Sequence, residues 1–308
     1  MLPRTRTALA ALPLTLAVAP ALAQLGPKAE ISKQGLIDGV DFSLRANGEI
    51  TLQADLRDSP GSVAVYRAGA NLGLFTSVGE DWRIGMEVAW ETSWYNFRGA
   101  TTIIPGTDRP FHEMHQVRLA PTASHQLSTE WSYFFGGLFE FGAERDADFG
   151  DSFTGGGLIG ARYAVSETFA FSFGILAKTR LEKNALFAPI LGLEWQINDN
   201  VRLATRGLGG AITYTINDRW SFEAFGEYEA REYRLDDTGP NIDGVVRDRR
   251  APVGIGFTWR PTGQTELNLR GGAIVYQQFR TDTSTGLNIT EVRTEPTGFV
   301  SFGGSIRF

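Results

Sequence analysis

The sequence predicts an all-β protein, a transmembrane antiparallel up-and-down β-barrel of about 14 strands, with 12 as the alternative count. Three observations predict it. Apolar and polar residues alternate with period two over long stretches, and short turn-rich connections alternate with longer polar ones. No stretch after residue 24 approaches the roughly 20 consecutive apolar residues that a membrane helix needs. The composition agrees, because 36 Gly, 21 Phe, 8 Tyr and 7 Trp accompany only 3 Met.

The N-terminal segment has the three parts of a secretory signal. Arg4 and Arg6 precede an apolar stretch from Ala8 to Ala19, and the small-residue triplet Ala21-Leu22-Ala23 follows. The apolar stretch is too short for a membrane anchor, so we expect cleavage after Ala23 and export. The predicted organisation is a signal peptide over residues 1–23, a short periplasmic lead over residues 24–39 and a barrel over residues 40–308.

Charge and composition exclude several classes of protein. The 308 residues include 29 Lys and Arg against 35 Asp and Glu, a net charge of −6, which argues against a nucleic-acid-binding protein. The absence of Cys excludes disulfides, thiol catalysis and Cys-ligated zinc.

The first predicted strand shows the pattern at its longest. Between Val40 and Leu56 the even positions are apolar or small and the odd positions are polar, a run of 17 residues that far exceeds the ~5–6 of a common soluble strand. Asn47-Gly48 is a hairpin signal inside this run, but the alternation continues across it, which favours one strand. A second long run, Trp82 to Tyr95, places apolar residues on one face and Arg83, Glu87 and Glu91 on the other.

Twelve further runs bring the count to about 14. They span residues 66–74, 117–123, 131–141, 157–165, 169–177, 189–197, 201–206, 211–216, 220–230, 253–259, 267–279 and 300–308. Short turns are expected at residues 78–81, 166–167, 198–200, 217–219 and 261–263, and longer polar loops at residues 98–111, 143–152, 180–186, 235–250 and 281–293. In the loop 235–250 we expect the basic run Arg247-Asp248-Arg249-Arg250 to be exposed, where it could contact lipopolysaccharide.

A soluble β-sandwich would also contain repeated amphipathic strands. Aromatic residues near the strand ends, such as Trp82, Trp131 and Trp220, argue against it, because they suit the two interfaces of a bilayer. The C-terminal segment adds an independent signal: apolar or small residues occupy every second position back from Phe308, including Phe302 and Ile306. Since lipid cannot satisfy open sheet edges, this last strand must close on the first.

This terminal pattern resembles the assembly signal of bacterial outer-membrane β-barrels. The resemblance implies that the barrel assembly machinery recognises Phe302, Ile306 and Phe308, and that the protein lies in the outer membrane in contact with lipid and lipopolysaccharide. In size the chain is similar to the small monomeric fourteen-stranded porins, and a monomer is favoured. Strand and turn units such as Pro189 to Asp199 and Tyr214 to Trp220 also resemble an uncharacterised family of outer-membrane proteins whose domain has no known function.

The face opposite the aromatic residues would line the lumen. Its charged candidates are Arg45, Arg67, Arg83, Glu87, Glu91, Arg118, Glu140, Arg162, Glu194, Arg202, Glu227 and Arg270. A narrow lumen would pair such charges into struts between strands, which is the favoured interpretation, and a wide one would keep them hydrated as a charge-selective constriction. Bulky apolar residues also point inward, and we expect them to fill the bore: Phe134, Leu138, Leu158, Leu176, Ile190, Phe225, Ile274, Tyr276 and Phe299.

No catalytic, cofactor or metal site is predicted. His112, His115 and His125 are the only histidines, and His112 and His115 lack the spacing of a helical zinc motif. Ser124 and His125 are neighbours, which point to opposite faces of a strand and cannot act directly on each other. The sequence therefore favours a narrow channel or transport protein for small solutes. A closed structural or loop-display barrel is the first alternative, and a barrel hydrolase acting on lipid is the second.

Overall fold

The computed structural model describes residues 39–205 and 207–308. The predicted signal peptide and residues 24–38 of the predicted lead lie outside this range. Within the described residues the only helix is η1 (Gly150–Ser152), and no helix is long and apolar enough to cross a membrane.

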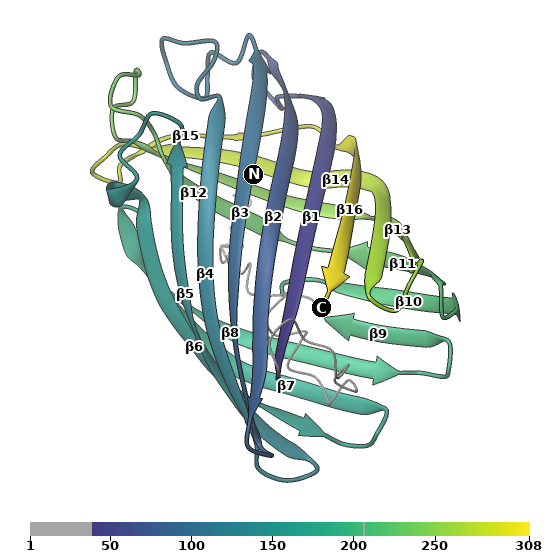
Figure 1. Cartoon of the computed structure of the whole chain (residues 1–308). Helices are drawn as coiled ribbons and strands as arrows, with labels where there is room; N and C mark the ends of the chain where they lie inside the picture. The colour runs from purple at the N-terminus through teal and green to yellow at the C-terminus, as the bar shows by residue number, and fades with distance from the viewer. Residues whose placement is uncertain (1–38, 206) are drawn as a thin grey trace, which may run out of the picture.

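Strands make up most of the described chain (Figure 1). They are β1 (Val40–Asp55), β2 (Ser62–Val78), β3 (Trp82–Arg98), β4 (Glu113–Gln126), β5 (Trp131–Glu144), β6 (Phe153–Ala164), β7 (Phe169–Arg180), β8 (Lys183–Gln196), β9 (Val201–Thr205), β10 (Gly210–Asn217), β11 (Trp220–Gly226), β12 (Glu229–Arg234), β13 (Val245–Trp259), β14 (Thr265–Asp282), β15 (Asn288–Arg293) and β16 (Thr297–Arg307). The run from Val40 is one strand, as predicted, because Asn47 and Gly48 lie within β1.

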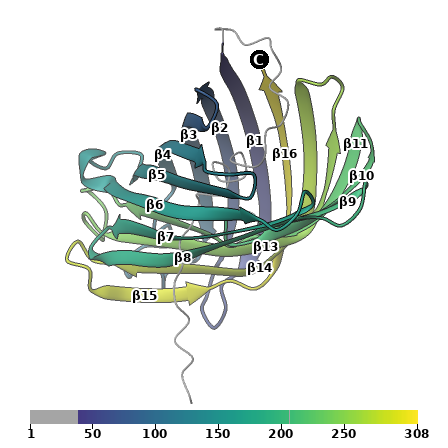
Figure 2. The same cartoon turned by 90° about the horizontal axis from the view of Figure 1, so that it is seen from below.

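Fourteen of these strands form one closed antiparallel barrel, which confirms the predicted fold class and strand count. The order is β1 to β11, then β13, β14 and β16, and β16 pairs back onto β1 from Ser43 with Arg307 to Thr51 with Phe299. Figure 2 shows β1 and β16 side by side where the barrel closes. Of the other two strands, β12 pairs with residues 245–250 of β13, and β15 pairs with residues 278–282 of β14.

The two faces of the wall differ as a membrane barrel requires. Large apolar side chains are exposed on the outside, among them Leu52, Leu191 and Ile255, at 58%, 73% and 70%. Their neighbours in sequence point inward, and the aromatic rings of the outer face do not pack between two sheets. The sandwich alternative is therefore excluded, and the fold is that of an outer-membrane β-barrel of small-porin size.

The two ends of the barrel differ in their connections. At the end where β1 begins and β16 finishes, the turns are short, as between β10 and β11 (Asp218 and Arg219), and we call this the short-turn end. The opposite, long-loop end carries the connections of residues 99–112, 145–152 and 235–244. In bacterial barrels the short turns face the periplasm.

Three predicted loops are wrong in part. Residues 183–186 belong to β8, so β7 and β8 are joined by the two-residue turn of Leu181 and Glu182, with Glu182 at a φ of +53°. Residues 245–250 belong to β13, and residues 288–293 form β15. Residues 245–250 and 288–293 have polar side chains on both faces, which reads as a loop in sequence but becomes a strand when both faces find polar partners in the fold.

The barrel narrows towards the long-loop end. After Gly226 the chain leaves the wall, and Figure 1 shows β12 beside the upper parts of β4 and β5, across the molecule from β11. There Arg234 forms a parallel bridge with Ala143 of β5, and on the other side Leu56 bridges Thr294. Among the described residues the ring at this level therefore consists of nine strands, β1 to β5 and β12 to β15. Side chains fill a ring of about eight strands, whereas one of fourteen leaves space inside.

The inward course of β12 leaves β8 with β7 as its partner on one side and without a strand on the other side over most of its length. Among the described residues β8 pairs with β9 only through Glu194, Trp195 and Gln196. The Leu193 amide donates to the Thr205 side chain (2.8 Å), so the amides of every second residue above it also point to the missing neighbour. One of these positions is Pro189, which has no amide hydrogen and is a residue found at strand edges.

A β-bulge corrects the predicted orientation of Tyr276. In the ladder of β13 and β14, Ala251 pairs with Tyr276 and Pro252 with Ile274, so Val275 is an extra residue and the alternation of β14 reverses above it. Ile274 is therefore buried inside as predicted, but Tyr276 and Arg280 lie on the opposite face, and Phe279 takes the inward position.

Candidate functional site

An arm of the wall, residues 229–250, crosses the barrel and divides its long-loop half. The arm contains β12 and the first six residues of β13, paired from Glu229 with Arg250 to Arg234 with Val245. On one face, Glu229, Arg231 and Tyr233 share a side with Val246, Asp248 and Arg250 and point to β1, β2 and β3. The other face, which includes Glu232, Arg247 and Arg249, points to the turn between β7 and β8.

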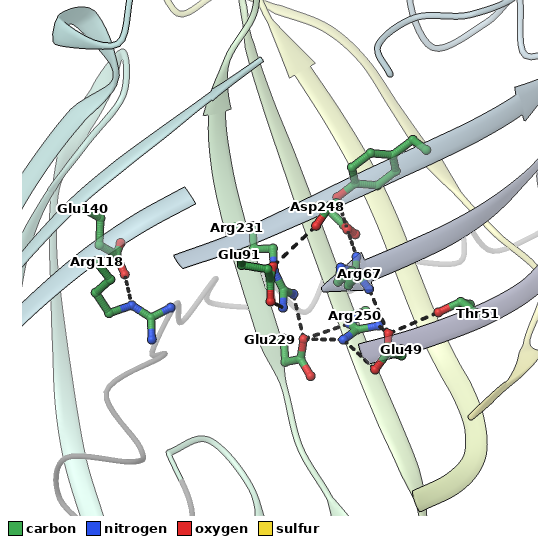
Figure 3. A network of polar contacts seen from close by, with 12 residues as sticks. Glu49, Thr51, Arg67, Glu91, Arg118, Glu140, Glu229, Arg231, Asp248 and Arg250 are labelled. Atoms are coloured by element: carbon green, nitrogen blue, oxygen red, sulfur yellow. Dashed lines mark hydrogen bonds and ion pairs between the residues drawn. The ribbon is translucent and has the colours of Figure 1, made fainter. Parts of the chain in front are cut away.

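Asp248 is the centre of a buried polar network on the first face (Figure 3). It is fully buried, and its Oδ2 accepts hydrogen bonds from Arg67 Nη2 (2.6 Å) and the Tyr95 hydroxyl (2.8 Å). Its Oδ1 accepts one from Gln277 Nε2 (3.0 Å). These contacts join the arm to β2, β3 and β14.

Two arginines of the arm complete the network. Arg231 forms a bidentate pair with Glu91, with bonds of 2.6 and 3.0 Å, and a further bond of 2.7 Å to Glu229. Arg250 bonds Glu229 and the Glu49 carboxylate, to which Arg67 also donates (3.1 Å). Three arginines thus meet four carboxylates, and each charge has a partner, which is what makes burial of charge tolerable.

An apolar core fills the ring beyond the network, towards the long-loop end. Tyr95, Phe97, Phe111 and Phe279 pack ring to ring, with centroids 4.8 to 6.2 Å apart. The same cluster includes Leu56, Val63, Val65, Ile103, Ile104, Met114, Tyr233, Leu235, Val246 and Val292. The long-loop half of the bore is therefore closed by side chains.

The second face of the arm is tied to the turn between β7 and β8. Glu232 accepts hydrogen bonds from Arg180 Nε (3.0 Å) and Arg247 Nε (2.5 Å), and Arg234 Nη2 donates to Glu182 (2.7 Å). Arg247 also donates to the Leu181 carbonyl and pairs with Asp282. The turn is thereby fastened to the arm above the unpaired edge of β8.

A further cluster lies on β4 to β8. Glu140 accepts from Arg118 Nε (2.9 Å) and pairs with Lys178. Beside it, five of the apolar residues predicted to fill the bore form a buried cluster with Ala120 and Ala188: Phe134, Leu138, Leu158, Leu176 and Ile190. Leu186 and Leu208 pack against this cluster. Phe225, Ile274 and Phe299 are also buried, in a smaller cluster with Ala211.

The other predicted lumen charges lie in the short-turn half and, except for the buried Glu87, are less buried. Arg162 and Arg202 approach Glu194 at 3.7 and 3.5 Å, and Arg270 pairs with Glu223 (2.7 Å) and Glu227 (3.5 Å). Arg83 lies over the Phe75 ring, Glu87 accepts from Asn71, and Arg45 is half-buried on the inner face of β1. The Arg202 side chain is 53% exposed. Of the predicted lumen charges, Arg67 and Glu91 therefore belong to the network of the arm, and Arg118 pairs with Glu140. The others lie outside these two clusters.

The arm could not be read from the sequence for an identifiable reason. Arg247 to Arg250 were expected in an exposed loop, yet all four are buried in β13, and Asp248 and Arg250 form hydrogen bonds with the wall. This expectation is wrong. No alternation marks these strands, because residues 231, 232, 234 and 247–250 carry charges on both faces, as a polar loop also would.

At the long-loop rim, an exposed ion pair joins the connection after β1 to the one before β16. Arg57 donates from Nε (2.9 Å) and Nη2 (3.0 Å) to the two Glu295 oxygens. The hydrogen bond from Arg57 holds the pKa of the Glu295 carboxyl below its usual value.

The histidines take part in wall contacts. His115 lies between the Thr92 hydroxyl (2.9 Å) and Glu113 (3.4 Å), and His125 stacks on Tyr133. Across residues 39–205 and 207–308, no three His, Asp or Glu side chains are grouped to hold a metal ion.

The predicted assembly residues lie on the outer face of the closing strand. Phe302, Ile306 and Phe308 are 60%, 41% and 41% exposed. Phe302 faces Gly48 of β1, where an added Cβ would meet the ring at 2.6 Å, so the ring covers the glycine.

No protein-family model matches this sequence, and no match was found among curated proteins. The resemblance of the strand and turn units to an uncharacterised family therefore stays a prediction.

The fold is similar to that of several solved outer-membrane proteins. A FadL homologue of Pseudomonas aeruginosa is 12% identical, with 88% of this chain and 90% of that chain covered and a TM-score of 0.49. An outer-membrane channel from Pseudomonas putida F1 is 10% identical, with 92% and 100% covered and a TM-score of 0.45. The toluene transporter TodX of Pseudomonas putida is 10% identical, with 94% and 92% covered and a TM-score of 0.43. Likenesses this distant carry no conclusion about a solute.

Proposed function

We propose that this protein is an outer-membrane transport barrel for small solutes, whose passage is closed by the arm. The observation that carries the proposal is that a segment of the wall itself, residues 229–250, fills part of a bore that fourteen strands make too wide for wall side chains alone. A barrel that serves only as a support has no need of that width.

The charges of the short-turn half support a hydrated vestibule. Arg202 and Arg270 are partly exposed, at 53% and 26% of their side chains, and their ion pairs with Glu194 and Glu227 are as long as 3.5 Å. Charges that remain in contact with water suit passage of small polar or charged solutes.

The chemistry of the arm supports movement. Three ion pairs join the arm to β1, β2 and β3, and their partners regain hydration when they separate in a wet lumen, so part of the lost attraction is offset. Displacement of the arm would connect the vestibule to the long-loop end.

A reversible lock tests the arm as a gate. The chain has no Cys, so the bridge partners Ala143 and Arg234 can be replaced by cysteines as the only thiols. The matched control places cysteines at the other bridge of this ring, Leu56 and Thr294, which does not involve the arm. In planar bilayers we expect the oxidised A143C/R234C protein to conduct at least tenfold less than the same protein after reduction, and the control to conduct equally in both states.

Two results would contradict the proposal. Equal conductance of A143C/R234C before and after reduction would show that the arm is not the gate. Absence of solute flux and conductance in the reduced and wild-type proteins, with the barrel folded, would remove the transport function.

The alternative is a closed structural or loop-display barrel. The apolar core around Phe279 favours it, because opening a gate there would expose apolar side chains to water at a cost in free energy. This alternative predicts no conductance in any variant. It also predicts that deleting residues 237–240, at the exposed tip of the arm, abolishes binding of a loop partner, whereas a gate would keep or increase conductance after the same deletion.

A further inference from the structure

We propose that Arg249 anchors a binding site for an amphipathic organic anion, a carboxylate with an apolar body, on the face of β13 beside the unpaired edge of β8. The inference deepens the proposed function, on which it rests for any role in transport, because it names the class of solute. Binding itself does not require passage and is tested separately.

Two adjacent arginines of β13, Arg249 and Arg250, differ in their hydrogen-bond partners. Arg250 points to β1 and bonds two carboxylates, Glu49 and Glu229. Arg249 points the other way, and its one hydrogen bond to a described residue is a long one, 3.4 Å, from Nη1 to the Gln278 side-chain oxygen. Its Nε is buried without an acceptor, and no described carboxylate pairs with it.

Arg249 is nevertheless only 9% exposed. Burying a guanidinium without a counter-charge is costly, and native structures tolerate such a group mainly where something else completes it. The neighbours with the largest electrostatic influence on Arg249 are Tyr228, Arg180, Tyr276 and Arg247. Two of them are cations and two are phenols, and none is a carboxylate.

Two acids on this face of the arm are already paired with other cations. Glu232 accepts from both Arg180 and Arg247, and Asp282 pairs with Arg247, Arg280 and Lys183. A third acid, Glu291, accepts from the Gln278 amide (2.6 Å) and reaches Arg249 only through that side chain. The guanidinium of Arg249 thus has no direct carboxylate partner among the described residues, and its fork matches the two oxygens of a ligand carboxylate.

Apolar groups continue from this cation. The Tyr228 amide donates to the Leu208 carbonyl (3.2 Å), and Leu208 packs with Leu186 on the buried cluster that includes Ala188 and Ile190 of β8. Tyr228, next to Arg249, thus links the cation to an apolar surface. A ligand with a carboxylate at one end and a hydrocarbon or aromatic body at the other fits this order of groups.

The interruption of the ladder gives this surface an approach from the side. Above Leu193, β8 is paired with β7 on one side and has no strand on the other, and its outward residues Phe187 and Leu191 are 70% and 73% exposed. Backbone without a partner is tolerated at this depth only where it faces protein, water or a ligand. The turn of Leu181 and Glu182 bounds the interruption above, and the segment of Gly207 to Gly209 bounds it below.

The test is equilibrium binding of octanoate to the full-length barrel in nanodiscs of zwitterionic phosphatidylcholine, measured by calorimetry with empty nanodiscs as the blank. We expect Arg249→Gln to weaken binding about tenfold or more, because a charge-assisted bond is lost. Arg249→Lys should bind more tightly than Arg249→Gln. The matched control is Arg260→Gln, at the opposite end of β13, where affinity should not change.

Three further probes define the ligand class. Inorganic phosphate should bind at least tenfold more weakly than octanoate, and 1-octanol should bind wild type and Arg249→Gln equally. Octanoate affinity should be the same in nanodiscs that contain phosphatidylglycerol. If the site held a lipid headgroup instead, phosphatidylglycerol would compete with octanoate and weaken its binding.

The proposal is overturned if octanoate binds Arg249→Gln as tightly as wild type while both are folded, or if phosphate binds as tightly as octanoate. Loss of octanoate binding in phosphatidylglycerol nanodiscs would assign the site to lipid and overturn the solute assignment. A barrel that binds octanoate but does not conduct would fail the proposed function and leave this inference standing, and the reverse result would do the opposite.

Discussion

The two halves of this barrel solve the same problem of interior space in opposite ways. At the short-turn end fourteen strands enclose a bore whose charges, such as Arg202 and Arg270, remain partly hydrated. At the long-loop end nine strands enclose a ring that is filled, with Asp248 and Phe279 fully buried. The same wall strands β1 to β5 serve both halves, so the difference comes from where β12 and β15 join the ring.

This comparison teaches that strand number need not be constant along a barrel. A strand that leaves the wall reduces the circumference above it, and its departure has a cost, which is the unpaired edge of β8. In a bilayer an open edge is expensive, so a native chain is expected to keep one only where the edge has a use.

The largest expected effect is on the buried network. Arg67 keeps Glu49 as a counter-charge in Asp248→Asn, but the new amide has only one acceptor oxygen, so Arg67 and Tyr95, which both donate to Oδ2, lose their acceptor. Leaving these two buried donors unsatisfied should cost about 3–5 kcal/mol of folding free energy. Glu194→Gln, in the short-turn half, should cost less than about 1 kcal/mol, because its partners are partly solvated. Denaturant unfolding in lipid vesicles, followed by Trp fluorescence, measures both, and equal losses would refute the contrast between the halves.

The sequence predicts the barrel well and the arm poorly. Alternation places Phe134, Leu176 and Phe299 inside and Phe302 outside, because a period of two leaves no other choice for a strand in a closed wall. It fails at Val275, where one extra residue reverses the pattern above it and turns Tyr276 away from the lumen. A bulge has no unique sequence signature, so alternation alone cannot locate the extra residue.

The arm is hard to predict for a different reason. Residues 245–250 read as a charged loop because sequence shows which residues are polar and not which carboxylates await them on β1, β2 and β3. Arg67 and Glu91 were identifiable as inward charges, but their partners Asp248 and Arg231 come from more than a hundred residues away. Such pairings depend on the tertiary path of the chain.

The next largest effect is the difference in stability loss between a proline placed on the unpaired edge of β8 and one placed in the fully paired strand β7. Leu191 and Phe173 are cross-strand partners on β8 and β7, and both side chains face lipid. Phe173→Pro removes a bond to β6 and should cost about 3 kcal/mol or more, whereas Leu191→Pro removes an amide that points to the missing neighbour and should cost less than about 1 kcal/mol. Unfolding free energies of the two variants decide it. A large loss for Leu191→Pro would mean that this part of β8 has a neighbour in the membrane.

A smaller and purely kinetic contrast concerns access to the lumen. Thr213, on the inner face of β10, is half-buried, and Thr281, on the inner face of β14, is fully buried. In this Cys-free chain, Thr213→Cys should react with a hydrophilic thiol reagent at least about a hundredfold faster than Thr281→Cys, since reaction of the buried thiol needs local opening. Equal rates would show that the long-loop half is open in solution.

The smallest effect is expected at the exposed pair of Arg57 and Glu295, which joins the rim of the nine-stranded ring. Because Arg57 lowers the pKa of Glu295, any stability from the pair is present above the usual pKa of the carboxyl and is lost as the pH falls below it. Water screens a pair that is half exposed, so Glu295→Gln should leave the unfolding midpoint at pH 7 unchanged within error. The wild-type and Glu295→Gln midpoints should also coincide at pH 3. A clear loss at pH 7 that disappears at pH 3 would mean that the rim is held by this pair, and that closure of the narrow ring depends on surface charge as well as on the buried network.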